Sequence, residues 1–235
     1  MNFIALDAST EACSVAILFN GKLYNQFELC PQSHSLVLLP MVDEMLKEAR
    51  CTLADMDALI YGKGPGSFTG VRIGIGVAQG LAFACDLPTI GVSTLQAMAQ
   101  QVIETADSQN VQVAIDARMS EVYTARFSAN DEGIAKLQGD EIVIPPAKLA
   151  ERYANGEYEP LNDVVGAGTG WGAYNEDLSE LCQNANDISV LYPDAKYMLT
   201  LGKLAFDQGL AKPAEEAQPT YVRDTVSWKK LPGRE

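Results

Sequence analysis

Hydrophobic and polar residues alternate along the first thirty positions of the chain, a pattern typical of β-strands that bury one face. Asn20 and Gly21 stand between two of the apolar runs, and this residue pair favours the type I′ turn of a hairpin. The pattern predicts a meander of three strands. From about Ser35 to Arg50 the apolar residues instead recur at helical spacing, which predicts a helix.

Short strands and helices alternate in the rest of the chain. We expect strands at 58–62 and 89–92, one helix in the glycine-rich stretch 62–82, and another that starts at the capping box Ser93–Gln96. Residues 113–127 repeat the alternation of residues 4–19, with an aspartate at the same offset, so a second, similar unit begins there. That unit should contain strands near 141–144 and 163–166, and helices after Pro146, after Gly170 and from about Asp194 to Gln208.

Two successive units of this kind match a duplicated fold better than a single Rossmann sheet. We therefore expect an α/β protein with the duplicated actin-like ATPase (ASKHA) fold, in which each of two lobes has a central mixed sheet flanked by helices. The N-terminal lobe should span residues 1–106 and the C-terminal lobe residues 107–235, with the seam near residues 105–110.

The charge and hydropathy of the chain bear on its partners. Its 235 residues carry a formal net charge of −14, which repels the phosphates that supply most of the affinity in nucleic-acid binding. If RNA is involved, we expect another chain to hold it. The longest uncharged apolar run, 73–85, is shorter than the roughly 20 residues of a membrane helix, and the N-terminus lacks the basic region of a signal peptide. We expect a cytoplasmic protein with no membrane contact.

Candidate metal and nucleophile chemistry is sparse. The 5 cysteines are widely spaced without a CxxC pair, which indicates reduced thiols rather than a disulfide framework or a zinc site. His34 is the single histidine, so a paired-histidine site cannot form, and we expect no bound metal. No G-x-S-x-G motif supports a hydrolase that would use His34, and little in the sequence favours a peptidase.

The stretch "GKGPGSFTGVRIGIGVAQGLA" at 62–82 raises the question of phosphate binding. Its glycines fit neither the Walker A spacing nor the dinucleotide-binding spacing. Glycines four residues apart on a helix allow another helix to approach closely. We therefore expect these glycines to serve helix packing.

A nucleotide site of the actin-like kind is the alternative interpretation. Actin-like kinases hold phosphate and metal on an Asp-x-Gly-[Ser/Thr] turn in the first hairpin of each lobe. Here the first turn offers Asp7, Ser9 and Thr10 without the glycine, and the second offers only Asp116. In this alternative the chain is an ATP-binding phosphotransferase or ATPase that uses Asp7 and Asp116.

The adenosine of such a nucleotide would lie at a third glycine cluster, formed by Gly166, Gly168 and Gly170. A plain strand-to-helix turn is the favoured interpretation of this cluster, because the bulky Trp171 is adjacent. We expect no required cofactor, with weak ATP or ADP binding at a vestigial site as the alternative.

Four segments, "LDASTEACSVAIL", "SHSLVLLPMVDEML", the glycine-rich stretch and the ending "PTYVRDTVSWKK", together resemble the bacterial TsaB family, also called YeaZ, over nearly the whole chain. TsaB is a shortened paralogue of TsaD, which transfers a threonylcarbamoyl group to the adenosine beside the anticodon in tRNAs that read codons beginning with A. The resemblance implies a non-catalytic subunit that binds TsaD, and with it the small ATPase TsaE, after TsaC has made threonylcarbamoyl-adenylate. It also implies a homodimer in the absence of TsaD, contact with tRNA only through the complex, and any nucleotide at the subunit junction.

The resemblance further implies that the first two helices form the partner surface. The first helix has too many apolar residues for one narrow core-facing stripe, and methionines suit a surface that repacks against different partners. The expected interface residues are Leu38, Met41, Val42, Met45 and Leu46 on the first helix and Arg72, Ile73, Gly74, Val77, Gly80 and Leu81 on the second.

The chain ends in a basic tail within an acidic protein. The tail contains Arg223, Lys229, Lys230 and Arg234. We expect a solvated terminus, with docking to TsaD, TsaE or tRNA as the alternative.

Overall fold

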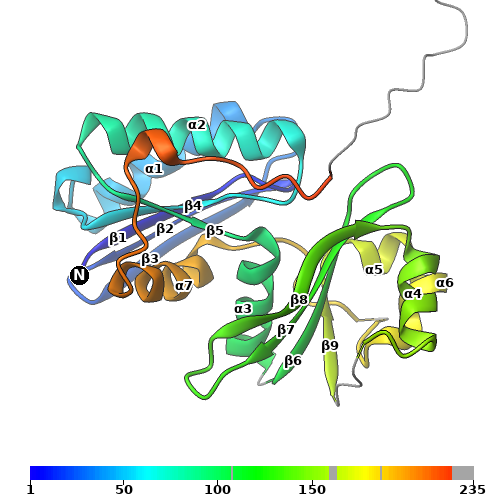
Figure 1. Cartoon of the computed structure of the whole chain (residues 1–235). Helices are drawn as coiled ribbons and strands as arrows, with labels where there is room; N and C mark the ends of the chain where they lie inside the picture. Colours follow the sequence, from blue (N-terminus) through cyan, green and yellow to red (C-terminus); the bar gives the residue numbers. More distant parts are fainter. Residues whose placement is uncertain (107, 159–162, 186, 224–235) are drawn as a thin grey trace, which may run out of the picture.

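The structure is a computed structural model that describes residues 1–106, 108–158, 163–185 and 187–223. Within these ranges the strands form two sheets, which lie in separate lobes (Figure 1). The sheet of the first lobe, sheet A, has the strand order β3-β2-β1-β4-β5. Its strands are β1 (Phe3–Asp7), β2 (Ala12–Phe19), β3 (Lys22–Leu29), β4 (Ala58–Gly62) and β5 (Thr89–Val92).

Sheet B, in the second lobe, repeats this arrangement with the order β8-β7-β6-β9. In each lobe the first three strands are antiparallel neighbours, and the fourth strand pairs in parallel with the first. Asp7 and Asp116 each end the first strand of a lobe, so the internal repeat predicted from the sequence is confirmed as a repeated topology. The strands of sheet B are β6 (Asn110–Asp116), β7 (Val122–Ala129), β8 (Ala135–Ile144) and β9 (Val164–Ala167).

Helices cover both sheets. α1 (His34–Ala49) and α2 (Phe68–Ala84) pack on one face of sheet A, and α7 (Ala195–Asp207) packs on the other (Figure 1). α3 (Thr94–Ala106) packs on one face of sheet B. The opposite face of sheet B carries α4 (Pro146–Ala154), α5 (Gly170–Ala173) and α6 (Asn175–Leu178). The described 3-10 helices are η1 (Leu53–Asp55), η2 (Ser179–Leu181) and η3 (Ala214–Glu216).

The packing of α3 and α7 corrects the expected lobe boundary. Buried side chains of α3, Leu95 and Met98 among them, share a core with β6 of sheet B. α7 comes late in the chain but packs on sheet A, where a Cβ added to Gly202 would lie 2.3 Å from the Ile60 side chain. Each lobe therefore contains a helix from the other side of residue 106, and the division into 1–106 and 107–235 is wrong for these two helices.

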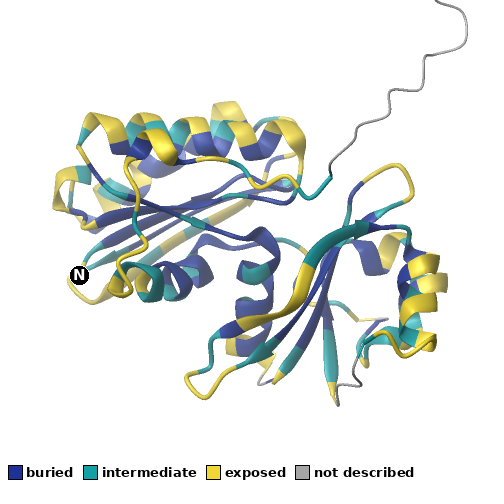
Figure 2. Ribbon diagram, in the orientation of Figure 1, coloured by how far each residue is buried: buried dark blue, intermediate teal, exposed yellow. Residues whose placement is uncertain are grey.

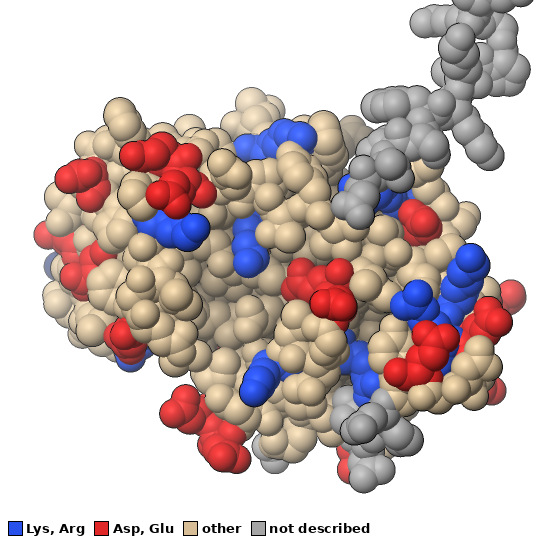
Figure 3. Space-filling model, viewed as in Figure 1, with Lys and Arg blue, Asp and Glu red and all other residues tan. Residues whose placement is uncertain are grey.

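Exposed residues and charged side chains are not spread evenly over the molecule. Figure 2 shows that the outer sides of α1, α2 and α4 are exposed while the central strands of both sheets are buried. On the face shown in Figure 3, Lys and Arg side chains are interspersed among acidic groups and form no single basic patch. In the described part of the chain, no helix combines the length and apolar character needed to cross a membrane.

Candidate functional site

Asp7, at the end of β1, is buried beneath the turn that follows it. It is 1% exposed, and its Oδ1 accepts hydrogen bonds from the backbone N–H and the Oγ of Ser9, each at 2.9 Å. Thr94, at the start of α3, donates to the same Ser9 Oγ at 2.9 Å. Among the described residues Asp7 Oδ2 has no hydrogen-bond partner. Burial raises the pKa of this carboxyl to about 6, because it disfavours the charged form. Through the Ser9 hydroxyl, Asp7 nevertheless links the end of β1 to the start of α3.

The first glycines of the stretch 62–82 pack against the β1–β2 turn of the same chain. A Cβ added to Gly66 would lie 2.1 Å from the Ser9 carbonyl oxygen, and one added to Gly70 would lie 2.2 Å from the Ala8 carbonyl oxygen. Ser67 caps α2, because its Oγ accepts from the Gly70 N–H at 3.3 Å. This half of the stretch therefore makes an intramolecular contact, and its glycines allow two backbone segments of one chain to meet.

A cleft of about 560 Å³ lies between the lobes beside this turn. Its walls come from the β1–β2 turn, the first turn of α2, the β6–β7 turn and residues 220–223. Ser9, Thr10 and Asp116 of the nucleotide-site candidates line the cleft, whereas Asp7 faces Gly62 at the back of the turn. The structure thus brings only part of the predicted phosphate-binding set to the cleft.

Asp116 is already engaged by neighbouring groups. Its carboxylate accepts hydrogen bonds from the Arg118 backbone N–H at 2.9 Å, from Arg118 Nη1 at 3.0 Å and from the Tyr174 hydroxyl at 3.0 Å. Arg118 also forms an ion pair with Glu11 of the first lobe at 3.1 Å. The β6–β7 turn therefore presents a paired arginine to the cleft rather than free backbone amides.

The third glycine cluster does not line the cleft, although the hydroxyl of Thr169, between two of its glycines, accepts a hydrogen bond from the Asp116 N–H at 3.2 Å. A Cβ added to Gly168 would lie 2.2 Å from the Ala114 carbonyl oxygen, and one added to Gly166 would lie 2.8 Å from the Trp171 ring. Trp171 is fully buried, and Gly170 likewise packs on Ala114. The three glycines pack on Ala114 and the indole, and they do not line the cleft that Ser9, Thr10 and Asp116 line.

The apolar residues of α1 face mostly inward, which corrects the expected partner surface. Leu38, Met41, Val42 and Met45 belong to the core beneath α1 and are each at most 5% exposed, and Leu46 is half-buried against the same core. The stripe is wide because α1 packs against both β2 and α2. The exposed apolar residues of this helix are instead Leu36, at 76%, and Leu39, at 48%.

The predicted residues of α2 divide between the inside and the outside of the lobe. Gly74 is buried, and its added Cβ would lie 3.6 Å from Ala8 Cβ, so Gly74 contacts its own chain and not a partner. Gly76 and Gly80 are exposed, with nothing within 4 Å of an added Cβ. The half-buried apolar residues of the helix are Ile73, Val77 and Leu81.

Aromatic side chains stand at both ends of α2. Phe68 and Phe83 are 66% and 77% exposed. The exposed Arg72 stacks on Phe68 with its guanidinium 3.3 Å from the ring centroid, and it donates a hydrogen bond to the Tyr221 hydroxyl. We call the exposed surface formed by Leu36, Leu39, Phe68, Arg72, Gly76, Gly80 and Phe83 the α1–α2 face.

Sequence reasoning missed a cluster on the inner side of α1. Cys13, Cys30 and His34 are buried, and their ligand atoms lie within 4.8 Å of one another. The spacing of Cys30 and His34, C-x₃-H, is the signal that the sequence contains. Cys13 comes from the neighbouring strand β2, so its place in the cluster depends on strand pairing.

The residues at the start of the C-terminal tail cross from one lobe to the other. The Thr220 N–H donates to the Lys63 carbonyl at 2.8 Å in the first lobe. Arg223 donates to the Ala117 carbonyl at 3.2 Å and to Glu121 at 2.6 Å in the second. Lys229, Lys230 and Arg234, the other basic residues of the tail, lie outside the described residues.

Comparison with known proteins places the chain in a family. The profile of the family described as TsaD, tRNA N6-adenosine threonylcarbamoyltransferase, matches residues 25–230. The tRNA threonylcarbamoyladenosine biosynthesis protein TsaB of Escherichia coli (strain K12) is 45% identical, with 100% of both chains aligned, and that of Haemophilus influenzae is 44% identical, with 100% of this chain and 99% of the relative aligned. The structure of YeaZ from Pseudomonas aeruginosa matches with a TM-score of 0.81 and 40% identity, covering 94% of this chain and 99% of that one.

The chain therefore belongs to the TsaD family, and the duplicated actin-like fold predicted from its sequence is confirmed. Within that family it belongs with the TsaB proteins, also called YeaZ.

Proposed function

We propose that this protein is a non-catalytic subunit in the synthesis of threonylcarbamoyladenosine in tRNA, and that it binds TsaD through the α1–α2 face. Its full-length relatives carry the name of this biosynthesis, which supports the process. Binding of TsaD is inferred from the α1–α2 face, because its exposed apolar side chains and open glycines suit the packing of a helix from another protein.

The α1–α2 face combines apolar anchors with a place for close approach. Leu36, Phe68 and Phe83 are each at least 66% exposed, and exposed large apolar side chains on adjacent elements are typical of protein interaction sites. Gly76 and Gly80 lie between the two phenylalanines with open space above them. A helix of the partner can therefore pack close to α2, where a larger side chain would hold it away.

The interior of the cleft supports a binding role rather than a catalytic one. Asp7 is buried behind the β1–β2 turn, and Asp116 is held by Arg118 and Tyr174. Both aspartates of the alternative ATPase interpretation thus have structural partners. In the proposed complex TsaD performs the transfer, and this chain contributes contact surface.

The acidic character of the chain supports contact of tRNA with another subunit. A net charge of −14 opposes binding of a polyanion, and the face in Figure 3 has no basic patch that would offset it. We expect tRNA contact only through the complex, TsaE to join through TsaD, and the α1–α2 face to pair two copies when TsaD is absent. A surface used for both partners predicts competition between them.

The test is the molar mass in solution, measured by light scattering for this chain alone, for TsaD alone and for their mixture, with and without ATP. We expect a homodimer of this chain that is replaced by a one-to-one complex when TsaD is added. Phe83→Glu, which places a charge on the α1–α2 face, should abolish both assemblies, whereas Leu137→Glu, at an exposed apolar position of β8, should abolish neither. A chain that stays monomeric and ignores TsaD would overturn the proposal.

A further inference from the structure

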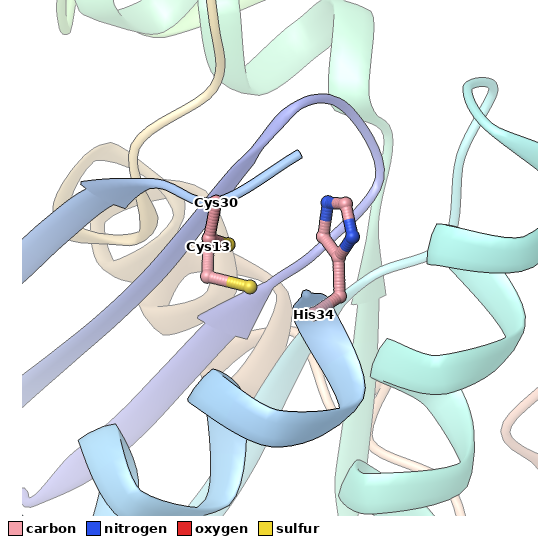
Figure 4. A group of neighbouring side chains, drawn as sticks. All are labelled: Cys13, Cys30 and His34. Atoms are coloured by element: carbon pink, nitrogen blue, oxygen red, sulfur yellow. The ribbon is translucent and has the colours of Figure 1, made fainter. Parts of the chain in front are cut away.

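Cys13, Cys30 and His34 come together from three elements on the inner side of α1 (Figure 4). Cys13 lies in β2, Cys30 directly follows β3, and His34 is the first residue of α1. Their exposed fractions are 0%, 5% and 8%. The ligand atoms lie within 4.8 Å of one another, close to the roughly 3.5–4 Å that separates two ligand atoms bound to one ion at thiolate distances. The proposed partner binding makes no use of these groups.

We propose that Cys13, Cys30 and His34 form a binding site for a soft, thiophilic metal ion, Cu(I) or Zn²⁺. Thiolates and imidazole are the ligands that these ions prefer, whereas Mg²⁺ and Ca²⁺ require oxygen. The donor set favours Cu(I), because two thiolates and one imidazole complete a three-coordinate site, whereas Zn²⁺ takes a fourth ligand. His34 lines the cleft between the lobes, so water from the cleft can supply that ligand.

A backbone carbonyl holds the imidazole beside the thiols. His34 Nε2 lies 2.6 Å from the Thr10 carbonyl oxygen. Because a carbonyl oxygen only accepts, Nε2 carries the proton and a neutral ring has its lone pair on Nδ1. Metal-bound histidines commonly donate their other N–H to a backbone carbonyl. Figure 4 shows Nδ1 on the side of the ring away from the cysteines, so coordination through Nδ1 requires the ring to turn about its Cβ–Cγ bond, whereas coordination through Nε2 replaces the bond to Thr10.

The Cys13 thiol keeps its proton in the absence of metal. Burial raises the pKa of the Cys13 thiol, and the hydrogen bond with Cys30 raises it further. The nearby carboxylates of Asp7 and Glu28 act in the same direction, and the same negative charges attract a cation. An entering ion must displace the thiol protons, so its affinity should rise with pH, with release of about two protons for each ion bound.

A bound ion would join the start of α1 to the β2–β3 hairpin. It would therefore stabilise the lobe that carries the α1–α2 face, since a ligand that binds only the folded chain raises its stability. This consequence is independent of TsaD binding and can be measured on the purified chain.

The first experiment uses Cd²⁺ as a spectroscopic probe of the reduced protein. We expect one ion per chain, a thiolate-to-cadmium charge-transfer band that strengthens as the pH rises, a ¹¹³Cd chemical shift that reports sulfur and nitrogen ligands, and a higher melting temperature. Competition titrations then compare Cu(I), against bathocuproine disulfonate, with Zn²⁺, against a chromophoric chelator. Tighter binding of either ion identifies the natural metal, and the absence of both the band and a sulfur-type ¹¹³Cd shift would overturn the site.

Variants locate the site within the chain. Cys30→Ser and His34→Gln should each weaken Cd²⁺ binding by about 100-fold or more. The matched controls Cys51→Ser and Cys182→Ser remove half-buried thiols outside the cluster and should bind as the original chain does. Equal losses in the controls would contradict the assignment. If a cluster variant fails to fold, the ¹¹³Cd shift of the unaltered chain decides the question.

Discussion

Gly74 and Ala8 are packed against each other, and a Cβ added to Gly74 would lie 3.6 Å from Ala8 Cβ. Gly80, six residues further along α2, has nothing within 4 Å of its added Cβ. The same glycine-rich helix therefore has an inner side that contacts its own chain and an outer side that is open. Substitutions at these two positions should have opposite effects on folding.

Gly74→Leu should destabilise the isolated chain and Gly80→Leu should stabilise it. Leucine at 74 overpacks the contact with Ala8, at a cost of about 1–3 kcal/mol. In the monomer, leucine at 80 meets no neighbour and replaces a poor helix former, for a gain of about 0.5–1 kcal/mol, and a protein concentration below that of dimer formation keeps the proposed pairing of two copies out of the comparison. Urea unfolding of the two variants measures both changes, and a destabilised Gly80→Leu would show that the outer side of α2 is not open.

Asp7→Asn should remove a pH dependence of stability. The folded pKa of Asp7 is about 6 against an ordinary value of 3.8, so the folded chain binds more protons than the unfolded chain between these values. Stability should therefore fall as the pH rises from about 4 to about 6 and stay lower above that, by roughly 3 kcal/mol. Asp7→Asn should be more stable than the original chain at pH 8 and lose this advantage near pH 4.

Unfolding free energies measured across this pH range test the effect of Asp7. The matched control is Asp131→Asn, which changes an exposed carboxyl and should leave the original pH profile in place. An Asp7→Asn variant that is less stable than the original chain at every pH would mean that the Asp7 carboxylate stabilises the β1–β2 turn.

Arg223→Ala should destabilise the chain more than Arg118→Ala, although Arg118 forms two ion pairs. The Arg118 side chain is 75% exposed, and exposed pairs contribute about 1 kcal/mol or less. The Arg223 side chain is 16% exposed and bonds the Ala117 carbonyl and Glu121, for which we expect about 1–3 kcal/mol. Thermal unfolding compares the two variants, and the reverse order would show that residues 220–223 contribute little to joining the lobes.

The isolated chain should show no tight binding of Mg–ATP. Asp116 is engaged by Arg118, and Gly168 packs on Ala114 instead of lining the cleft. Calorimetry at concentrations that would reveal micromolar binding measures this directly. Tight binding that is lost in Asp116→Asn would revive the ATPase interpretation.

The strand pattern and the internal repeat were readable from the sequence because both depend on local alternation. Strands 58–62 and 89–92 are observed as β4 and β5, and the repeated aspartate marks the end of β1 and of β6. The exchange of α3 and α7 between the lobes was not readable. Which sheet an amphipathic helix covers depends on how the chain crosses in space, and helical periodicity is the same in either case.

For a related reason, the sequence could not show which residues of the predicted interface are buried and which are exposed. An excess of apolar residues on α1 suggested that Met41 and Met45 point outward, but α1 uses a wide stripe against two neighbours. The exposed anchors, Leu36 and Phe83, are residues that the sequence pattern did not single out. Distinguishing the two sides requires the position of the sheet, which periodicity alone does not give.

The most direct test of the proposed function is the affinity of TsaD for Gly80→Leu, measured by calorimetry beside the matched control Gly172→Leu. Both glycines are exposed, with nothing within 4 Å of an added Cβ, and only Gly80 lies on the α1–α2 face. We expect Gly80→Leu to remain folded and to lose affinity by a factor of about 30 or more, equivalent to about 2 kcal/mol, while the control binds normally. Unchanged binding by a folded Gly80→Leu would contradict docking of TsaD on this face.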